Sequence, residues 1–222
     1  MKPYYEADGI TIYHADCREL IDELKPDAVL TDPPFFAPAV HYSSRIEWGK
    51  SWGDAMMLGQ WWEDTLKAVD SVPSVATFCD SESYPVFYPA MYRRFERLAG
   101  VVWDKGRIGM GTPWRHSFEL VLHGWNGTIS PDDRGQGDVI RISPVSPDER
   151  EHPAEKPNGL LRLLLGVMTS EDDVVLDPFM GSGSTLRAAK DLRRHAIGIE
   201  IEERYCEIAA RRLGQEVLDL WT

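Results

Sequence analysis

The sequence predicts an α/β protein with a single domain, 1–222, built on a seven-stranded, mostly parallel sheet with helices on both faces. Short apolar runs rich in β-branched residues alternate with segments of helical periodicity, which is typical of strands joined by crossover helices. Most of the runs are continuously apolar, as expected of strands covered on both faces. A length of 222 residues suits one domain better than two.

The expected elements follow these patterns in chain order. The apolar runs predict strands at 10–14, 28–31, 74–78, 98–103, 118–123, 173–177 and 195–201. Apolar residues at i, i+3 and i+4 predict helices at 17–24, 57–70, 83–97, 157–169, 184–193 and 203–213. Two stretches fit neither pattern: 36–57 is rich in Trp, Ser and Gly, and 126–155 in Pro, Gly and Asp. We expect surface loops there.

Composition excludes several classes of protein. A chain with 43% hydrophobic residues can bury a core, so we do not expect disorder. No apolar run approaches a membrane span and the first residues lack a signal-peptide core, so we expect a cytoplasmic protein. The three cysteines are odd in number and widely spaced, which fits neither a disulfide framework nor a metal site. His116 and His152 also lack partners at metal-ligand spacing, so we predict no metal.

The net charge of −12 argues at first against a nucleic-acid binder, because a polyanion repels an acidic chain. The charge is unevenly distributed, however. Residues 84–118 hold six basic and two acidic side chains, a positive island in an acidic protein. Arg93, Arg94 and Arg97 follow a helical pattern typical of a solvated face. The other basic residues of the island lie in a Gly-rich segment better suited to phosphate contacts.

The strongest local signal is DVVLDPFMGSGSTLRAAK, residues 173–190, where a strand leads through a glycine-containing turn into a helix. Gly181 and Gly183 let the backbone approach a ligand, and the hydroxyls between and after them can cap the helix or bind polar groups. Glu200 ends a strand 19 residues after Gly181, where α/β nucleotide sites place a ribose acceptor. A purely structural turn is the alternative. Leu186 stands where a dinucleotide fingerprint requires a third glycine, which argues against a nicotinamide dehydrogenase.

The second signal is AVLTDPPFF, residues 28–36, also at the end of an apolar strand. Two consecutive prolines stiffen the backbone and remove two amide donors, so carbonyl oxygens are left as acceptors. Asp32 adds a carboxylate and Phe35 an aromatic face, a combination that suits a flat ring carrying an amino group. The alternative is a Pro-Pro pair that merely ends the strand, with Phe35 in the core.

Together, DPPF (32–35) and DPFMGSG (177–183) resemble the family that methylates exocyclic amino groups of DNA bases with S-adenosylmethionine. The motif order, with EHPAEKP (151–157) before the glycine turn, is similar to the circularly permuted beta class with its Rossmann-like methyltransferase fold. The resemblance implies catalytic roles for Asp32, Pro33, Pro34 and Phe35. It implies cofactor contacts by Asp16, Cys17, Lys156, Asp177, Phe179, Gly181, Ser182, Gly183, Ser184, Thr185 and Glu200.

This chain departs from the family pattern in two places. The family's HPTQKP is altered by Ala154 and Glu155, so a hydroxyl contact to the cofactor carboxylate is expected to be missing. The segment that normally forms a target-recognition domain is reduced to about 128–150, within the short insert 126–155, which is too short for a domain of its own.

The resemblance also implies a mechanism. Asp32 and the Pro33 carbonyl accept hydrogen bonds from the exocyclic amine and so localise its lone pair for attack on the sulfonium methyl group. Phe35 stacks on the base after it leaves the duplex. DPPF rather than SPPF favours adenine N6 over cytosine N4.

DNA contacts are expected in two segments. The 36–57 loop carries Arg45, Lys50 and Trp52, which we expect to close over DNA beside the flipped base. The Gly-rich part of the basic island supplies Lys105, Arg107 and Arg115. Five such cations predict a shallow salt dependence of binding, with a log–log slope of about −4 to −5.

Other functions stay open at this point. The acidity and the missing recognition domain are compatible with a partner-dependent or non-catalytic subunit that binds cofactor while another chain holds DNA. A cytosine-N4 methyltransferase is the closer alternative. A homodimer would give a compact enzyme a second surface for DNA.

Overall fold

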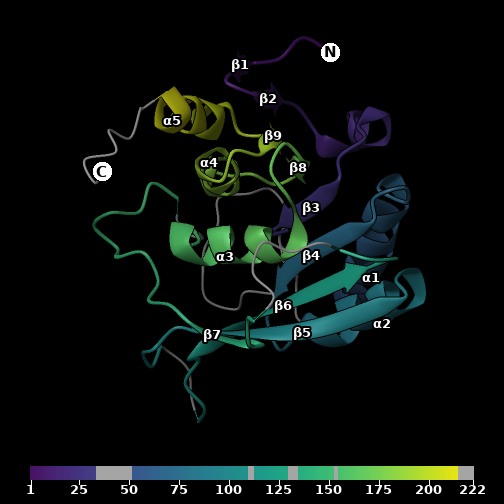
Figure 1. The fold of residues 1–222 in the computed structure, drawn as a ribbon. Coiled ribbons are helices and arrows are strands. Elements are labelled where there is room, and N and C mark those ends of the chain that lie inside the picture. The colour runs from purple at the N-terminus through teal and green to yellow at the C-terminus, as the bar shows by residue number, and fades with distance from the viewer. Residues whose placement is uncertain (34–51, 110–112, 130–134, 153–154, 215–222) are drawn as a thin grey trace.

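The computed structural model describes residues 1–33, 52–109, 113–129, 135–152 and 155–214; for 52–58 the description extends to the helix backbone. The described residues form one mixed sheet whose order is β1-β2-β9-β8-β3-β4-β6-β5-β7 (Figure 1). The strands are β1 (Tyr5–Ala7), β2 (Ile10–His14), β3 (Ala28–Thr31), β4 (Ser74–Cys79), β5 (Arg97–Asp104), β6 (Phe118–Trp125), β7 (Val139–Arg141), β8 (Val174–Asp177) and β9 (His195–Glu200). The five strands from β2 to β4 in this order are all parallel.

All seven predicted strands are present, so the predicted α/β architecture is confirmed, but the predicted number of strands was wrong. Two short strands, β1 and β7, bring the described sheet to nine. β7 lies inside the 126–155 stretch that was predicted to be loop and pairs with the edge of β5. Each added strand has three residues, and in β7 only Ile140 is buried, so neither has the apolar run that marks the other strands.

The helices cover both faces of the sheet, as predicted (Figure 1). They are α1 (Trp52–Ala68), α2 (Tyr84–Arg94), α3 (Asn158–Met168), α4 (Ser184–Asp191) and α5 (Glu203–Gly214). Alternation along the buried strand β3 explains how both faces are filled: Leu30 packs in the core with α3, α4 and α5, while Val29 packs in the core with α1 and α2.

Three helix predictions need correction. Residues 17–24 form two 3-10 turns, η1 (Cys17–Glu19) and η2 (Ile21–Glu23), because the backbone of Leu20 departs from helical angles between them. Helix α1 begins at Trp52, so the last part of the predicted 36–57 loop is helical. Helix α2 ends at Arg94, since Phe95 is extended, and Arg97 belongs to β5 rather than to a helix face. No described helix has the length and apolar character needed to span a bilayer.

Candidate cofactor and base site

The polar residues of both signature motifs lie at one edge of the sheet. β3, β8 and β9 are parallel neighbours, so their carboxyl ends meet, and these ends carry Thr31, Asp177 and Glu200. The Thr31 hydroxyl donates a hydrogen bond to Asp177 Oδ1 at 2.9 Å, joining segments 146 residues apart. The chain therefore brings the DPPF and DPFMGSG segments together where open α/β sheets bind ligands.

The glycine turn between β8 and α4 depends on backbone conformations that side chains resist. Gly181 and Gly183 both have positive φ, at 51° and 77°. A Cβ on Gly183 would lie 2.7 Å from the Ala209 Cβ of α5, so the turn packs too closely for a larger residue. Gly183 is the N-cap of α4 and no side chain caps this helix, so the predicted capping by the neighbouring hydroxyls was wrong. The buried Ser182 and Thr185 instead bond to carboxylates, Thr185 to Asp177.

Two acidic residues frame this turn. The Glu200 Oε2 atom accepts a hydrogen bond from the Gly181 amide at 3.0 Å, and Oε1 accepts one from the Glu202 amide at 2.8 Å. Burial raises the pKa of Glu200, while the amides oppose the rise. Burial also raises the pKa of Asp177 to about 6, against the hydrogen bonds from Thr185 and Thr31. A ligand along the turn would thus meet the half-buried carboxylate of Glu200 and the buried carboxylate of Asp177.

Asp16 and Cys17, predicted as cofactor contacts, follow β2 at the same edge. Asp16 caps η1 through the Arg18 amide and pairs with the Arg18 side chain, whose hydrogen bond lowers the pKa of Asp16. Cys17 points into the core beneath α1 and α2, and burial raises the pKa of its thiol to about 11. Cys17 can therefore offer a ligand its backbone but no thiolate.

Asp32 follows β3 and has two unequal carboxylate oxygens. Its Oδ2 accepts a hydrogen bond from the Lys156 ammonium at 2.5 Å. Its Oδ1 is buried and has no hydrogen-bond partner within the described parts of the chain. A buried acceptor without a partner is costly unless a ligand satisfies it. Pro33 is buried beside it, and Pro34 and Phe35 lie outside the described residues.

Lys156 belongs to a cluster of charged side chains that includes Asp32 and Glu119. Its ammonium lies 3.3 Å from Glu119 Oε2 and 4.8 Å from the centre of the Phe78 ring. Glu119 Oε1 pairs in turn with Lys105 at 2.6 Å. Sequence reasoning missed Glu119, although a carboxylate inside the apolar strand 118–123 was the available signal. Lys156, predicted as a cofactor contact, and Lys105, predicted as a DNA contact, both have their ammonium groups on carboxylates of this cluster.

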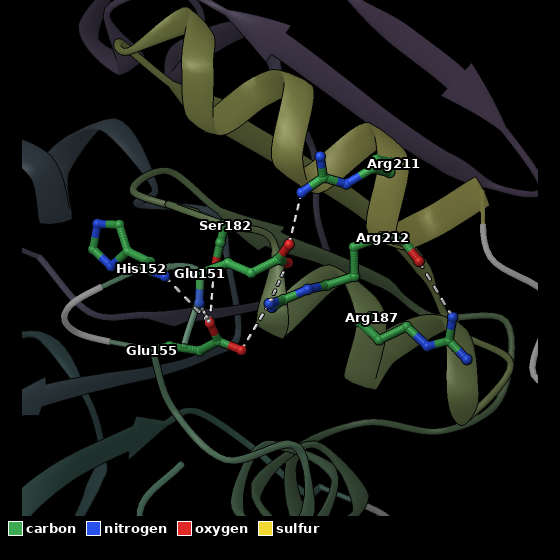
Figure 2. Close-up of polar contacts among 7 residues, drawn as sticks. All are labelled: Glu151, His152, Glu155, Ser182, Arg187, Arg211 and Arg212. Carbon is green, nitrogen blue, oxygen red and sulfur yellow. Dashed lines mark hydrogen bonds and ion pairs between the residues drawn. The ribbon is translucent and has the colours of Figure 1, made fainter. Parts of the chain in front are cut away.

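The segment 151–157, which departs from the family pattern, is bonded to the glycine turn and to α5. Figure 2 shows the Glu155 carboxylate between Ser182, Arg212 and the backbone of residues 151 and 152. Arg212 donates to Glu155 Oε1 at 2.7 Å, and Ser182 donates to Oε2 at 3.5 Å. Glu151 pairs with both Arg211 and Arg212. Glu155 therefore links the segment 151–157 to the glycine turn. Ala154 lies outside the described residues.

His152 packs against this turn. Its ring lies 4.5 Å from the ring of Tyr205 and within 3.6 Å of the position of a Cβ on Gly181. Burial lowers the pKa of His152 to about 4, helped by Lys156, Arg204 and Arg212. Within the described ranges no group of three or more potential ligands is placed to hold a metal ion.

The predicted DNA contacts are spread over two regions. Arg45 and Lys50 lie outside the described residues, and Trp52 is the first residue of α1. Arg107 and Arg115 are exposed on the connection between β5 and β6, here called the β5–β6 hairpin (105–109 and 113–117). Its two sides are joined by a hydrogen bond from the Gly109 amide to the His116 carbonyl.

Sequence reasoning missed two apolar residues of this hairpin. Trp114 is 87% exposed and Ile108 is 65% exposed, next to the two arginines. A shallow pocket of about 400 Å³ beside them is lined by residues that include Arg107, Ile108 and Arg141. Nucleic-acid interfaces commonly combine exposed aromatic rings with exposed cations.

Comparison with known proteins identifies the family. A family model described as DNA methylase, of the N6/N4 type, matches residues 93–211. The chain belongs to this DNA methylase family. The methylase is 28% identical over 250 residues to the type II methyltransferase M2.LlaDCHI of Lactococcus lactis subsp. cremoris, a match covering 96% of this chain and 93% of that one. It is also 28% identical over 251 residues to M2.DpnII of Streptococcus pneumoniae, with 97% and 93% covered.

Solved structures agree with this assignment. The methylase superposes on a complex of M1.HpyAVI with S-adenosylmethionine with a TM-score of 0.71, 25% identity, and coverage of 93% of this chain and 100% of the other. The PvuII cytosine-N4 methyltransferase has the same fold, with a TM-score of 0.78 and 19% identity over 98% and 90% of the two chains. The predicted family, Rossmann-like fold and activity as a DNA methyltransferase dependent on S-adenosylmethionine are confirmed. The circularly permuted order and the roles of single residues stay predictions.

Proposed function

We propose that the methylase transfers the methyl group to the exocyclic N6 of an adenine that has left the duplex. The observation that carries this proposal is Asp32 Oδ1, a buried acceptor without a partner among the described residues, next to the rigid Pro33. An exocyclic amine has two N–H groups. Asp32 Oδ1 and the Pro33 carbonyl oxygen can each accept a hydrogen bond from one of them. Asp32, rather than Ser, at the first motif position supports adenine over cytosine through the family resemblance.

Hydrogen bonding by these acceptors is the chemical contribution of the chain. The amine lone pair is delocalised into the ring, and two accepted hydrogen bonds favour a pyramidal nitrogen whose lone pair points at the methyl group. When bound along the glycine turn, the cofactor would supply an electrophilic methyl group on a sulfonium, which would leave as a neutral thioether. The methylated amine would then release one proton to solvent. Most of the rate enhancement comes from positioning and preorganised electrostatics.

The glycine turn and its two framing carboxylates are the proposed cofactor site. Glu200 faces the Gly181 amide at 3.0 Å and offers further lone pairs to ribose hydroxyls. Asp177, Phe179, Gly183 and Ser184 line the turn, with Asp16 at the next strand end. Glu155, in place of the family's usual residue, accepts a hydrogen bond from Ser182 in the middle of the turn.

The proposed DNA interface is the β5–β6 hairpin, with Arg107 and Arg115 on phosphates and the exposed Trp114 against bases. Arg45, Lys50 and Trp52 stay predicted contacts from sequence. Lys105 is removed from this set because its ammonium is paired with Glu119 and it is largely buried. The expected log–log salt slope is then about −4 at most.

One experiment tests the reaction directly. Purified wild-type chain is incubated with plasmid DNA and S-adenosylmethionine, and the modified nucleosides are identified by mass spectrometry. N6-methyladenine supports the proposal; N4-methylcytosine as the sole product excludes it. No product from the chain alone, with methylation restored by a cell extract, would favour the partner-dependent subunit instead.

The organisation of the enzyme on DNA is the remaining part of the proposal. Residues 126–155 replace a recognition domain, so a second copy of the chain or a DNA-binding partner would extend the contact surface. Sedimentation of the protein with and without a DNA duplex measures this. A mass of one chain per duplex at saturation would contradict the homodimer.

A further inference from the structure

Four charged side chains from four segments form a cluster that includes the proposed base acceptor, Asp32. Asp32 follows β3, Lys105 follows β5, Glu119 lies in β6 and Lys156 precedes α3. The Lys156 side chain is only 8% exposed, while those of Asp32 and Glu119 are each 19% exposed. Two carboxylates and two ammonium groups balance, which is the condition under which buried charges are tolerated.

Contacts around Lys156 leave it little freedom. Its ammonium donates to Asp32 Oδ2 at 2.5 Å, faces Glu119 Oε2 at 3.3 Å and lies against the Phe78 ring. Glu119 is held in turn by Lys105 at 2.6 Å. Because Oδ2 is occupied by this bond, the orientation of the Asp32 carboxylate is fixed and Oδ1 is the oxygen left for another donor.

We propose that Lys156 is a positioning residue for methyl transfer, which holds the Asp32 carboxylate with Oδ1 available to the target amine, while Glu119 and Lys105 hold Lys156. This inference rests on the proposed function, because it assigns the role of a residue behind the proposed acceptor. It also replaces the expectation that Lys156 contacts the cofactor.

Electrostatics gives Lys156 and Glu119 opposite effects on Asp32. Burial raises the pKa of Asp32, Lys156 lowers it, and Glu119 raises it. Lys105 lowers it further, while Asp177 and Cys79 are the other titratable groups that interact with Asp32. A carboxylate accepts a hydrogen bond from an amine best when it is ionised, so activity should fall as Asp32 takes up a proton.

The first test compares two variants by their pH–rate profiles, measured in single turnovers with saturating DNA and cofactor. In Lys156→Met, the acid limb should move to higher pH by roughly one unit or more, because Lys105 alone then opposes the effects of burial and Glu119 on the pKa of Asp32. In Glu119→Gln, the limb should move to lower pH. Shifts in the same direction, or unchanged limbs with slower rates, would contradict the proposal and indicate a merely structural role.

Cofactor affinity separates positioning from cofactor binding. The dissociation constant of S-adenosylmethionine, measured by calorimetry, should change by less than about threefold in Lys156→Met, since the ammonium is proposed to act on Asp32. An increase of about tenfold or more with an unshifted pH profile would return Lys156 to the cofactor site. Lys156→Arg keeps the charge and should retain the wild-type acid limb if it folds.

A measurement without turnover keeps the two proposals separate. The carboxyl ¹³C resonance of Asp32 is titrated by NMR in the wild type and in both variants, with Asp32→Asn used for assignment. The midpoint should rise in Lys156→Met and fall in Glu119→Gln. If these shifts appear while the wild type methylates no DNA, the proposed function fails although Lys156 holds the Asp32 carboxylate. If DNA is methylated and the midpoints do not move, the proposed function stands and the role of Lys156 is overturned.

Discussion

The cofactor side and the base side of the site are built in different ways. On the cofactor side, β8, the glycine turn, α4 and β9 are contiguous in sequence, and the Gly181 amide binds a carboxylate 19 residues away. On the base side, Asp32 is held by a lysine 124 residues away, which is held by Glu119 from a third segment. One side is fixed by local backbone conformation and the other by long-range charge pairing.

This difference has a physical consequence for how each side fails. A backbone turn with positive φ angles and no space for a Cβ disfavours any side chain, so substitution there is expected to damage binding and stability together. A buried ion cluster tolerates conservative exchange but not the loss of one partner, because the remaining charge is then unpaired.

The largest effect is expected from Asp32→Ala. Removal of the acceptor that localises the amine lone pair should slow methyl transfer by roughly 10³-fold, a size typical of a preorganised polar group. Cofactor affinity should change little, because Asp32 lies on the base side. Single-turnover methylation and calorimetry measure the two quantities. A loss of cofactor binding as large as the loss of rate would show that the two sides are not separable.

Acid should destabilise the fold through two histidines. Burial lowers the pKa of His123, which lies in β6 beside Ser74 of β4, to about 4, and that of His152 at the turn to about 4. For both histidines the folded pKa lies below the unfolded value of 6.5. Their contribution to the free energy of unfolding is therefore fully present above pH 6.5 and is lost as the pH falls toward 4. Each residue can remove up to about 3 kcal/mol by pH 4.

Urea unfolding at pH 7 and pH 5 measures this loss. His123→Asn keeps a polar partner for Ser74, which lies 3.0 Å from the histidine ring, and should reduce the difference between the two pH values. His14, which is exposed, provides the matched control: His14→Asn should leave the difference unchanged. An undiminished difference in His123→Asn would assign the acid sensitivity to other groups.

The difference between local backbone conformation and long-range charge pairing explains which parts of the site could be predicted from the sequence. The turn, its glycines and the carboxylate at the end of β9 were predicted because strand, turn and helix signals are local and contiguous. The cluster around Lys156 was not, because Asp32, Glu119 and Lys105 acquire their roles only when β3, β4, β6 and β5 lie side by side in that order in the sheet. The short strands β1 and β7 were missed because three residues at a sheet edge carry no periodicity.

Gly183→Ala tests the cofactor side at its tightest point. The positive φ of 77° and the approach of the new Cβ to Ala209 at 2.7 Å should cost about 1–3 kcal/mol of stability and weaken cofactor binding. Gly166→Ala in α3 is the matched control, since a Cβ there meets nothing within 4 Å and the helix should gain about 0.5–1 kcal/mol. Thermal unfolding and calorimetry measure both variants. Intact cofactor binding in a destabilised Gly183→Ala would remove the turn from the binding site.

The smallest effect is expected from the β5–β6 hairpin. Arg107→Ala and Arg115→Ala should each reduce the log–log salt slope of DNA binding by about 1, with the rate of methyl transfer at saturating DNA unchanged. Arg93→Ala in α2 is the control, because Arg93 is paired with Glu63 and should leave the slope as it is. Fluorescence anisotropy with a labelled duplex across a salt series measures the slopes. Equal effects in all three variants would place the DNA contact outside the hairpin and make the positive island a general electrostatic feature.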